Sequence, residues 1–284
     1  KTSINIKSIK KEKDIFEIKT DEDIFKSKNL VLATGGLGYP TLGATGDGYI
    51  FASSFGHTIT QTSPAMMPLF TKEKNFGSCK ADTIAKAILK VNIPKYKNLK
   101  LTGDLIFTKE GLRGPVILDF AREITPILEK YDEVPLLINF LKGKNEEDIF
   151  QHLKNEIAKN PQNNILQNLE TLHARSVSKE ILNICEIDEN LRFKQTEGLK
   201  REKLIKTLAW TPFTIVGHDG FRQAMITRGG VSLKEIEQKT MQSKIVQGLY
   251  FCGELVDIDG PCGGYNLQWS FSSGFLAGKL NKNI

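Results

Sequence analysis

The sequence predicts an α/β fold in which a parallel sheet is interrupted by a long insertion. Two short apolar runs, 30–33 and 248–252, show no polar alternation and each leads into glycines. Such runs are typical of strands that are covered on both faces. Between them the pattern changes to short β-like pieces, then to helical spacing, and then back to β. We therefore expect one domain interrupted by nested insertions.

Composition indicates an ordinary globular protein. Of 284 residues, 40% are hydrophobic and 25% are charged, and the net charge is +6. The lysines are spread widely, as in 7–14, so we expect no dedicated nucleic-acid binding. No apolar run is long enough to cross a bilayer, and we expect no membrane partner. The four cysteines are Cys79, Cys185, Cys252 and Cys262. They form no C-x-x-C motif and have no nearby histidines, so we expect neither a zinc site nor a disulfide framework. This use of cysteine predicts a cytoplasmic location.

The first elements follow from periodicity. Residues 3–18 alternate around a charged turn and predict a β-hairpin. Residues 30–33 predict the first buried strand. The stretch TGDGYIFASSFGH predicts a helix with Thr45 or Asp47 as N-cap and Gly56 just after its end.

The insertion predicts a small barrel or sandwich with a helical segment inside it. Residues 146–209 have helical spacing interrupted by Pro161, which favours several short helices with no convergent polar site. The β-like pieces are 67–70, 105–108, 116–118, 135–140, 213–216 and 224–227. The predicted boundaries are 1–62 and 247–284 for the sheet domain, 63–145 and 210–246 for the barrel, and 146–209 for the helical insert.

Both glycine turns follow buried strands, and ligands bind beyond the carboxyl ends of strands in open parallel sheets. Glu254 is placed to accept hydrogen bonds from sugar-like hydroxyls, and Asp257 and Asp259 extend this acidic edge. A helix is expected from about Leu267, with Asn266 as N-cap and its N–H groups facing an electron-rich oxygen. The alternative from the residues alone is a tight turn with a closely packed terminal helix.

Two long segments resemble a known family. LVLATGGLGYPTLGATGDGYIFASSFGHTI and GLYFCGELVDIDGPCGGYNLQWSFSSGFLAG are similar to BaiN/YhiN-type flavoproteins, also called the aminoacetone-oxidase family. These are FAD enzymes with a glutathione-reductase-like dinucleotide fold. The resemblance implies an FAD-binding domain with an inserted β-barrel that is itself interrupted by a small helical domain.

The resemblance also implies where FAD binds. The Ile6 backbone should lie at the adenine, and Gly35 and Gly36 near the pyrophosphate. The second turn should meet the phosphate and ribityl groups, and the following helix start should meet the pyrimidine edge of the flavin. The remaining implied cofactor-binding residues are Gly229, Gly230, Gly253, Glu254, Asp257, Gly263, Gly264, Tyr265, Asn266 and Leu267.

Catalytic residues are less well marked. His218 and Arg228 are candidates to reach a substrate above the flavin, although a surface role is equally open. We interpret His57 as structural, and we expect His152 and His173 to be solvated. We interpret Cys252 and Cys262 as small packed residues and not as a redox pair.

The predicted function is an FAD-dependent oxidoreductase with a small-molecule substrate and NAD(P)H as a candidate electron donor. One alternative is a nucleic-acid or protein-binding module on a degenerate flavoprotein fold. Another is a tRNA-modifying flavoenzyme, whose expected motifs are missing. Because family members start with a strand and a G-x-G-x-x-G turn that this sequence does not contain, we expect it to be a piece of a longer protein.

Residues 1–284 alone are expected to be free of flavin and inactive. The dinucleotide fingerprint holds the pyrophosphate through charge-assisted contacts worth about 1.5–3 kcal/mol each, and about 1.4 kcal/mol is a factor of ten in affinity. Titration of FAD into this chain by calorimetry is the test. Stoichiometric binding at micromolar or lower concentration would contradict the expectation.

Overall fold

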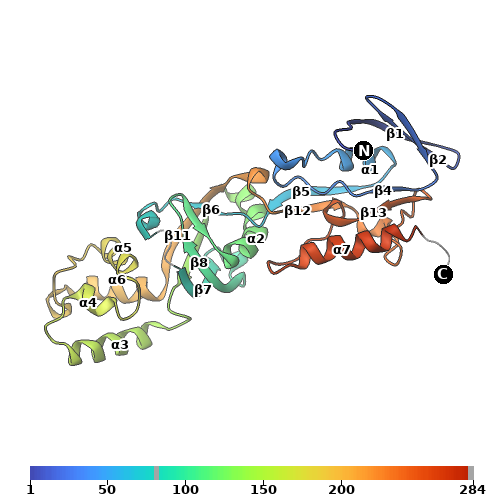
Figure 1. Ribbon diagram of the computed structural model, residues 1–284. Helices are drawn as coiled ribbons and strands as arrows, with labels where there is room; N and C mark the ends of the chain where they lie inside the picture. The colour runs from blue at the N-terminus through green and yellow to red at the C-terminus, as the bar shows by residue number, and fades with distance from the viewer. Residues whose placement is uncertain (80–82, 281–284) are drawn as a thin grey trace. The chain divides into compact units, whose positions relative to one another are not determined.

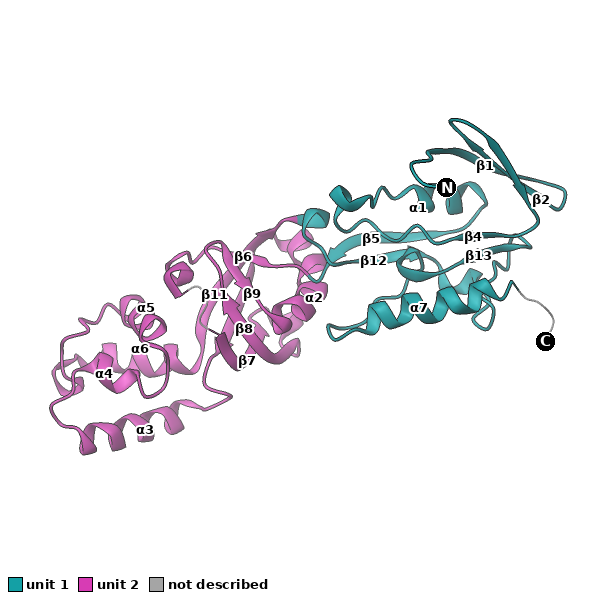
Figure 2. Ribbon diagram, viewed as in Figure 1, with its two compact units in different colours: residues 1–66, 220–284 teal, residues 67–219 magenta. Residues whose placement is uncertain are grey.

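The chain forms two compact units, which Figure 2 colours separately. Unit 1 comprises residues 1–66 and 220–284, and unit 2 comprises 67–219. The computed structural model describes residues 1–79 and 83–280, so 80–82 and 281–284, parts of the predicted barrel and C-terminal segments, lie outside the described residues. Residues 220–246, which we had assigned to the barrel, lie in unit 1 because their strand pairs there. The other predicted boundaries stay predictions.

Unit 1 begins with an antiparallel meander of β1 (Ile6–Glu12), β2 (Ile15–Thr20) and β3 (Ile24–Ser27). The first two strands form the predicted hairpin. The third was not predicted, because all four of its residues are exposed and its apolar pattern therefore carries no burial signal.

The centre of unit 1 is a parallel pair of strands distant in sequence. β4 (Leu30–Leu32) pairs with β13 (Leu249–Phe251), with Leu30 opposite Leu249 and Leu32 opposite Phe251. Both runs are buried or half-buried, as their unbroken apolar sequence predicted. Figure 1 shows the helix α7 (Tyr265–Gly278) running beside β13.

The helix α1 (Asp47–Ser54) follows the first glycine turn. Its N-cap is Gly46, so the prediction of Thr45 or Asp47 as the cap was wrong, while Gly56 lies just past the helix end with φ of 87° as expected. A second, antiparallel pair in unit 1 joins β5 (Ile59–Ala65) and β12 (Ile226–Val231), with an irregular register at Arg228 to Gly230.

Unit 2 contains a closed barrel. The strands are β6 (Leu69–Thr71), β7 (Thr83–Val91), β8 (Lys100–Phe107), β9 (Gly111–Arg113), β10 (Val134–Asn139) and β11 (Thr211–His218). They pair in the order β10-β11-β6-β9-β8-β7. The buried rings of Phe76, Phe107 and Phe213 pack against one another in unit 2, with Phe76 stacked on Phe107 at a centroid distance of 5.0 Å.

Residues 116–118 are helical, so their prediction as a β-like piece was wrong. They lie in α2 (Pro115–Tyr131), which begins with proline at its first position, where the missing N–H costs nothing. Buried side chains recur at helical spacing through Phe120, Ile124 and Ile127.

Helices α3 (Glu146–Lys159), α4 (Ile165–Leu169), α5 (Arg175–Cys185) and α6 (Gly198–Ala209) lie between β10 and β11. Pro161 falls between α3 and α4. Asn145 and Asn164 each form a reciprocal capping box at the start of these two helices. Among the helices of the described residues, none is long and apolar enough to cross a membrane.

His173 is buried, with 8% of its surface exposed, so the expectation that it is solvated was wrong. It packs edge-on against Phe140 at a centroid distance of 5.9 Å. Burial lowers the pKa of His173 to about 4. The spacing of apolar residues around His173 in the sequence gives no sign that its side chain is buried.

Acid should therefore destabilise unit 2 through His173. Its pKa is depressed on folding, so its neutral form contributes stability above about pH 6.5, and that stability is lost as pH falls toward about 4. The loss is at most about 3 kcal/mol from this group. Urea unfolding at pH 7 and pH 4.5 should show a smaller pH difference for His173→Phe than for the original chain, and equal differences would contradict the assignment.

Candidate functional site

The two glycine turns of unit 1 touch each other. Because β4 and β13 are parallel neighbours, their carboxyl ends lie at the same edge. A Cβ added to Gly36 would overlap the Oε1 carboxylate oxygen of Glu254 and the Oγ1 hydroxyl of Thr227. Only glycine lets the first turn approach the carboxylate that follows the second strand.

Thr227 of β12 joins the two turns through hydrogen bonds. Its N–H donates to Glu254 Oε1 at 2.8 Å, and its Oγ1 accepts from the Leu37 N–H at 2.7 Å. Thr227 is 1% exposed. Burial raises the pKa of Glu254, and the bonds from Thr227 oppose that rise. The carboxylate is thus held in place by the protein before any ligand arrives. We had not singled out Thr227, because a lone threonine in a strand has no distinguishing pattern.

Tyr49 of α1 is a further polar group that the sequence analysis missed. Its hydroxyl is buried beside Thr227 and near Glu254. Burial, followed by the negative charge of Glu254, raises its pKa, so the phenol is neutral.

Four of the predicted glycines fall into two classes. Gly35 and Gly264 have φ of 75° and 91°, and a Cβ on either would meet no atom within 4 Å. Gly229 and Gly230 are buried, and a Cβ there would strike the backbone of Gln61 or Leu255. The second class is explained by close packing within the protein, and its contact with a flavin stays a prediction. The first class leaves backbone open to a ligand.

The N-terminus of α7 is open. The helix begins at Tyr265 with Gly264 as N-cap, and no side chain caps it. The prediction of a start near Leu267 with Asn266 as cap was wrong. Asn266 instead accepts from the Gly260 N–H at 2.8 Å and donates to the Gly260 carbonyl at 3.0 Å. It thereby shapes the 260–264 loop and leaves the first-turn N–H groups without a side-chain acceptor.

Gly253 sits in the short turn that follows β13. Its N–H donates to Ser273 Oγ at 2.9 Å, and its carbonyl accepts from Trp269 Nε1 at 3.0 Å. Both backbone polar groups are therefore used within the protein, and the turn offers a ligand the Glu254 side chain instead. The Asp257 N–H donates to the Val231 carbonyl at 3.0 Å, and the Asp257 residue is half-buried.

Ile6 begins β1, opposite Thr20, and is 39% exposed. The alternation breaks between Ile6 and Ser8, where the register shifts. Its predicted contact with an adenine ring stays a prediction.

The two catalytic candidates belong to different units. His218 ends β11 in unit 2, and burial lowers its pKa, so it is neutral at physiological pH. Arg228 lies in unit 1, where its Nε is 4.0 Å from Asp259 Oδ1. This ion pair ties Arg228 to the acidic loop.

His57 is packed inside unit 1, in agreement with a structural role. Its Nε2 lies 2.8 Å from Ser243 Oγ, and its Nδ1 lies 3.2 Å from Glu235 Oε2. Ser243 Oγ also accepts the N–H groups of Ile245 and Val246. The Ser243 hydroxyl is occupied by these hydrogen bonds. His57, Ser243 and Glu235 therefore stabilise a loop and present no reactive oxygen.

Cys252 and Cys262 form no disulfide. Burial raises the pKa of Cys252, which keeps it as a thiol. This agrees with the interpretation of Cys252 as a packed residue.

Comparison with known proteins relates the whole chain to one family. A model described as the HI0933-like protein Rossmann domain matches residues 1–280. The chain is 28% identical over 278 residues to a 3-dehydro-bile acid delta(4,6)-reductase of Clostridium scindens, covering 98% of this chain and 68% of that protein.

Two further relatives carry a different name. Ribosomal RNA dihydrouridine synthases of Haemophilus influenzae and Escherichia coli are each 31% identical, over 267 and 252 residues, covering 93% and 87% of this chain. The chain spans 63% and 58% of the length of these two proteins.

The contact between the turns can be tested through stability. In a Trp210→Phe background, Trp269 is the remaining tryptophan and reports on unit 1. We expect Gly36→Ala to lower the free energy of unfolding by about 1–3 kcal/mol, because the methyl group displaces Glu254 or Thr227.

The matched control is Gly274→Ala in α7, where a Cβ meets no atom within 4 Å. Alanine there should be neutral or stabilise by up to about 1 kcal/mol. Equal midpoints in urea for the two variants would refute the proposed contact.

Proposed function

This chain belongs to the family of HI0933-like Rossmann-domain proteins, and from that premise we propose that its parent protein is an FAD-dependent reductase. The observation that carries the proposal is the meeting of the two glycine turns at Gly36 and Glu254. In an open parallel sheet this edge is where nucleotide cofactors bind.

The residues of unit 1 fit a flavin nucleotide. The open backbone at Gly35 lets a phosphate or sugar approach closely, and the fixed carboxylate of Glu254 is suited to accept hydrogen bonds from ribityl hydroxyls. The uncapped first turn of α7 is suited to the pyrimidine edge of the ring. Tyr49 places a neutral hydroxyl beside Glu254.

When bound, a flavin supplies hydride transfer. The contribution of this chain is electrostatic: N–H groups at the positive end of a 14-residue helix stabilise negative charge placed against them. We propose that Tyr265, Asn266 and Leu267 provide these groups. The exposed side chains of Tyr265 and Leu267 leave the helix end accessible.

The proposed reaction is the addition of a hydride and a proton across a carbon–carbon double bond. The names of two relatives support this class, since both a delta(4,6)-reductase and a dihydrouridine synthase are named for adding hydrogen to a substrate. NAD(P)H is the proposed source of electrons.

A uracil ring in RNA is the second candidate substrate, beside a small molecule. The observation in its favour is that two relatives at 31% identity are named ribosomal RNA dihydrouridine synthases. This candidate departs from our expectation that nucleic acid is not a partner.

The test of the cofactor uses the full-length parent protein. We expect it to carry the absorption bands of oxidised flavin, to release FAD on acid precipitation, and to bleach with NADH or NADPH. Protein free of flavin would refute the proposal and favour the non-catalytic binding module.

A matched pair of variants of the full-length parent protein locates the flavin site. Gly35 and Gly43 both have positive φ and open space around a Cβ, so alanine strains the backbone equally in kind at both. Gly35→Ala should weaken FAD binding about tenfold or more, a cost of about 1.4 kcal/mol or more. Gly43→Ala, after the short helix Pro40–Leu42, should leave affinity unchanged. Equal affinities would remove Gly35 from the site.

A further inference from the structure

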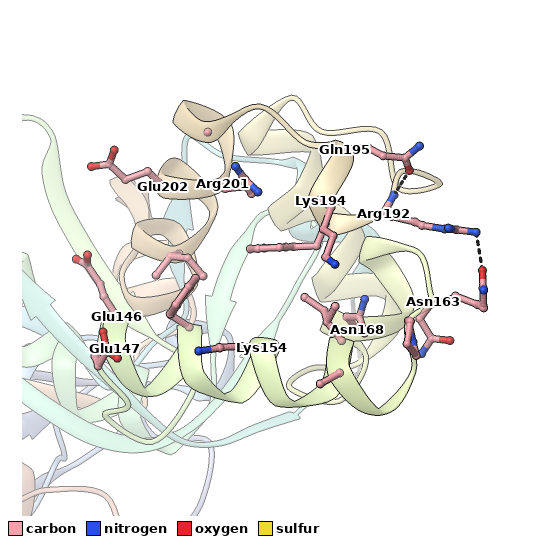
Figure 3. A pocket seen from close by; sticks show the side chains of 18 residues that line it. Glu146, Glu147, Lys154, Asn163, Asn168, Arg192, Lys194, Gln195, Arg201 and Glu202 are labelled. Carbon is pink, nitrogen blue, oxygen red and sulfur yellow. Dashed lines mark hydrogen bonds between the residues drawn. The ribbon is translucent and has the colours of Figure 1, made fainter.

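Unit 2 contains a pocket of about 1160 Å³ among its helices, between α3, α4, the segment 192–195 and α6. We had expected no convergent polar site in residues 146–209, and the inference below departs from that expectation. Part of the lining is apolar, from Phe150, Ile157 and Phe193. The rest is a set of charged and amide side chains, contributed by segments that periodicity alone does not bring together (Figure 3).

Charges in this pocket are separated. Figure 3 shows Glu146, Glu147 and Glu202 toward one end, with Arg201 beside Glu202, and Arg192 at the other end. Lys154 and Lys194 also line the pocket, both residues are exposed, and in the part of the chain that the structure describes neither ammonium group makes an ion pair or hydrogen bond. Exposed ammonium groups at a pocket are free to bind a phosphate or carboxylate.

An aromatic surface lies beside these cations. The Arg201 guanidinium lies 5.8 Å from the centroid of the Phe193 ring. Both residues line the pocket. Flat rings stack on phenylalanine and on guanidinium planes, which is how unpaired bases are commonly held.

Asn168 is a buried amide in the wall of the pocket. It is 2% exposed, and its Oδ1 has no hydrogen-bond partner, while its Nδ2 donates to the Asn164 carbonyl at 2.9 Å. A small rotation would present this oxygen to a ligand that carries an N–H group. Gln162 and Asn163 line the same pocket, and amide side chains recognise the donor and acceptor pattern of base edges.

We propose that this pocket binds a nucleotide, with the base against Phe193 and Asn168 and the phosphate at Lys154 and Lys194. An apolar ligand would leave both lysines unused. A long strand of nucleic acid would meet Glu146, Glu147 and Glu202, so the pocket holds one or a few nucleotides. The source is either a free mononucleotide or an unpaired residue of RNA. The proposal does not depend on a flavin in unit 1.

Binding is measured on residues 1–284 with two probes, uridine 5′-monophosphate by calorimetry and a fluorescein-labelled oligouridylate by anisotropy. Uridine is used because the adenine of FAD is proposed to bind unit 1. We expect saturable binding of at least one probe. Tight binding of the oligomer alone assigns the site to RNA, and equal binding of both assigns it to a free nucleotide. Binding of neither at millimolar concentration overturns the proposal.

Two double variants locate the binding. Lys154→Gln with Lys194→Gln should weaken it about tenfold or more and reduce the salt dependence of oligomer binding by about 0.7 per lysine. Lys159→Gln with Lys203→Gln removes the same charge from α3 and α6 at positions that do not line the pocket, and should change neither. Circular dichroism checks that both are folded.

A ring variant adds an independent readout. Phe193→Leu keeps apolar volume and removes the stacking surface, so it should weaken binding without changing the salt dependence.

Equal loss of binding in the two double lysine variants would show non-specific attraction and overturn the proposal. Competition by an acidic peptide of equal charge would also overturn it.

Discussion

The parallel pairing of β4 with β13 is the constraint on which unit 1 depends. It joins Leu30 to Leu249, and unit 2 lies in the chain between these strands. Once the two strands have paired, the segments that follow them leave the sheet at the same edge, and Gly36 is brought against Glu254. Thr227 then fixes the carboxylate through its N–H. The site is therefore a product of non-local pairing, and local sequence contributes mainly the glycines that allow the close approach.

Fold features with a local signal were predictable. The unbroken apolar runs identified the parallel strands, and alternation identified the first hairpin. The strand β3 and the helix α2 were not identified. β3 is fully exposed, and residues 116–118 look β-like until Pro115 is read as a helix start. Short apolar segments are ambiguous between the two states.

The candidate site was predictable in its glycines and acids but not in its supporting groups. Gly36 and Glu254 stand out in sequence, and the structure brings them together. Tyr49 and Thr227 do not stand out, because their importance arises from burial beside Glu254. Asn266 was assigned as a cap by its position, whereas its amide instead binds the Gly260 backbone. A side chain that bonds a distant loop competes with the cap role, and sequence spacing does not show which bond forms.

The central claim, that this edge of unit 1 receives a flavin, is tested most directly by a crystal structure of the full-length parent grown with FAD. The account predicts that a flavin ring oxygen accepts hydrogen bonds from the first-turn N–H groups of α7, with the nucleotide chain passing over Gly35. A flavin bound elsewhere, with the N-terminus of α7 covered by protein, would contradict the account.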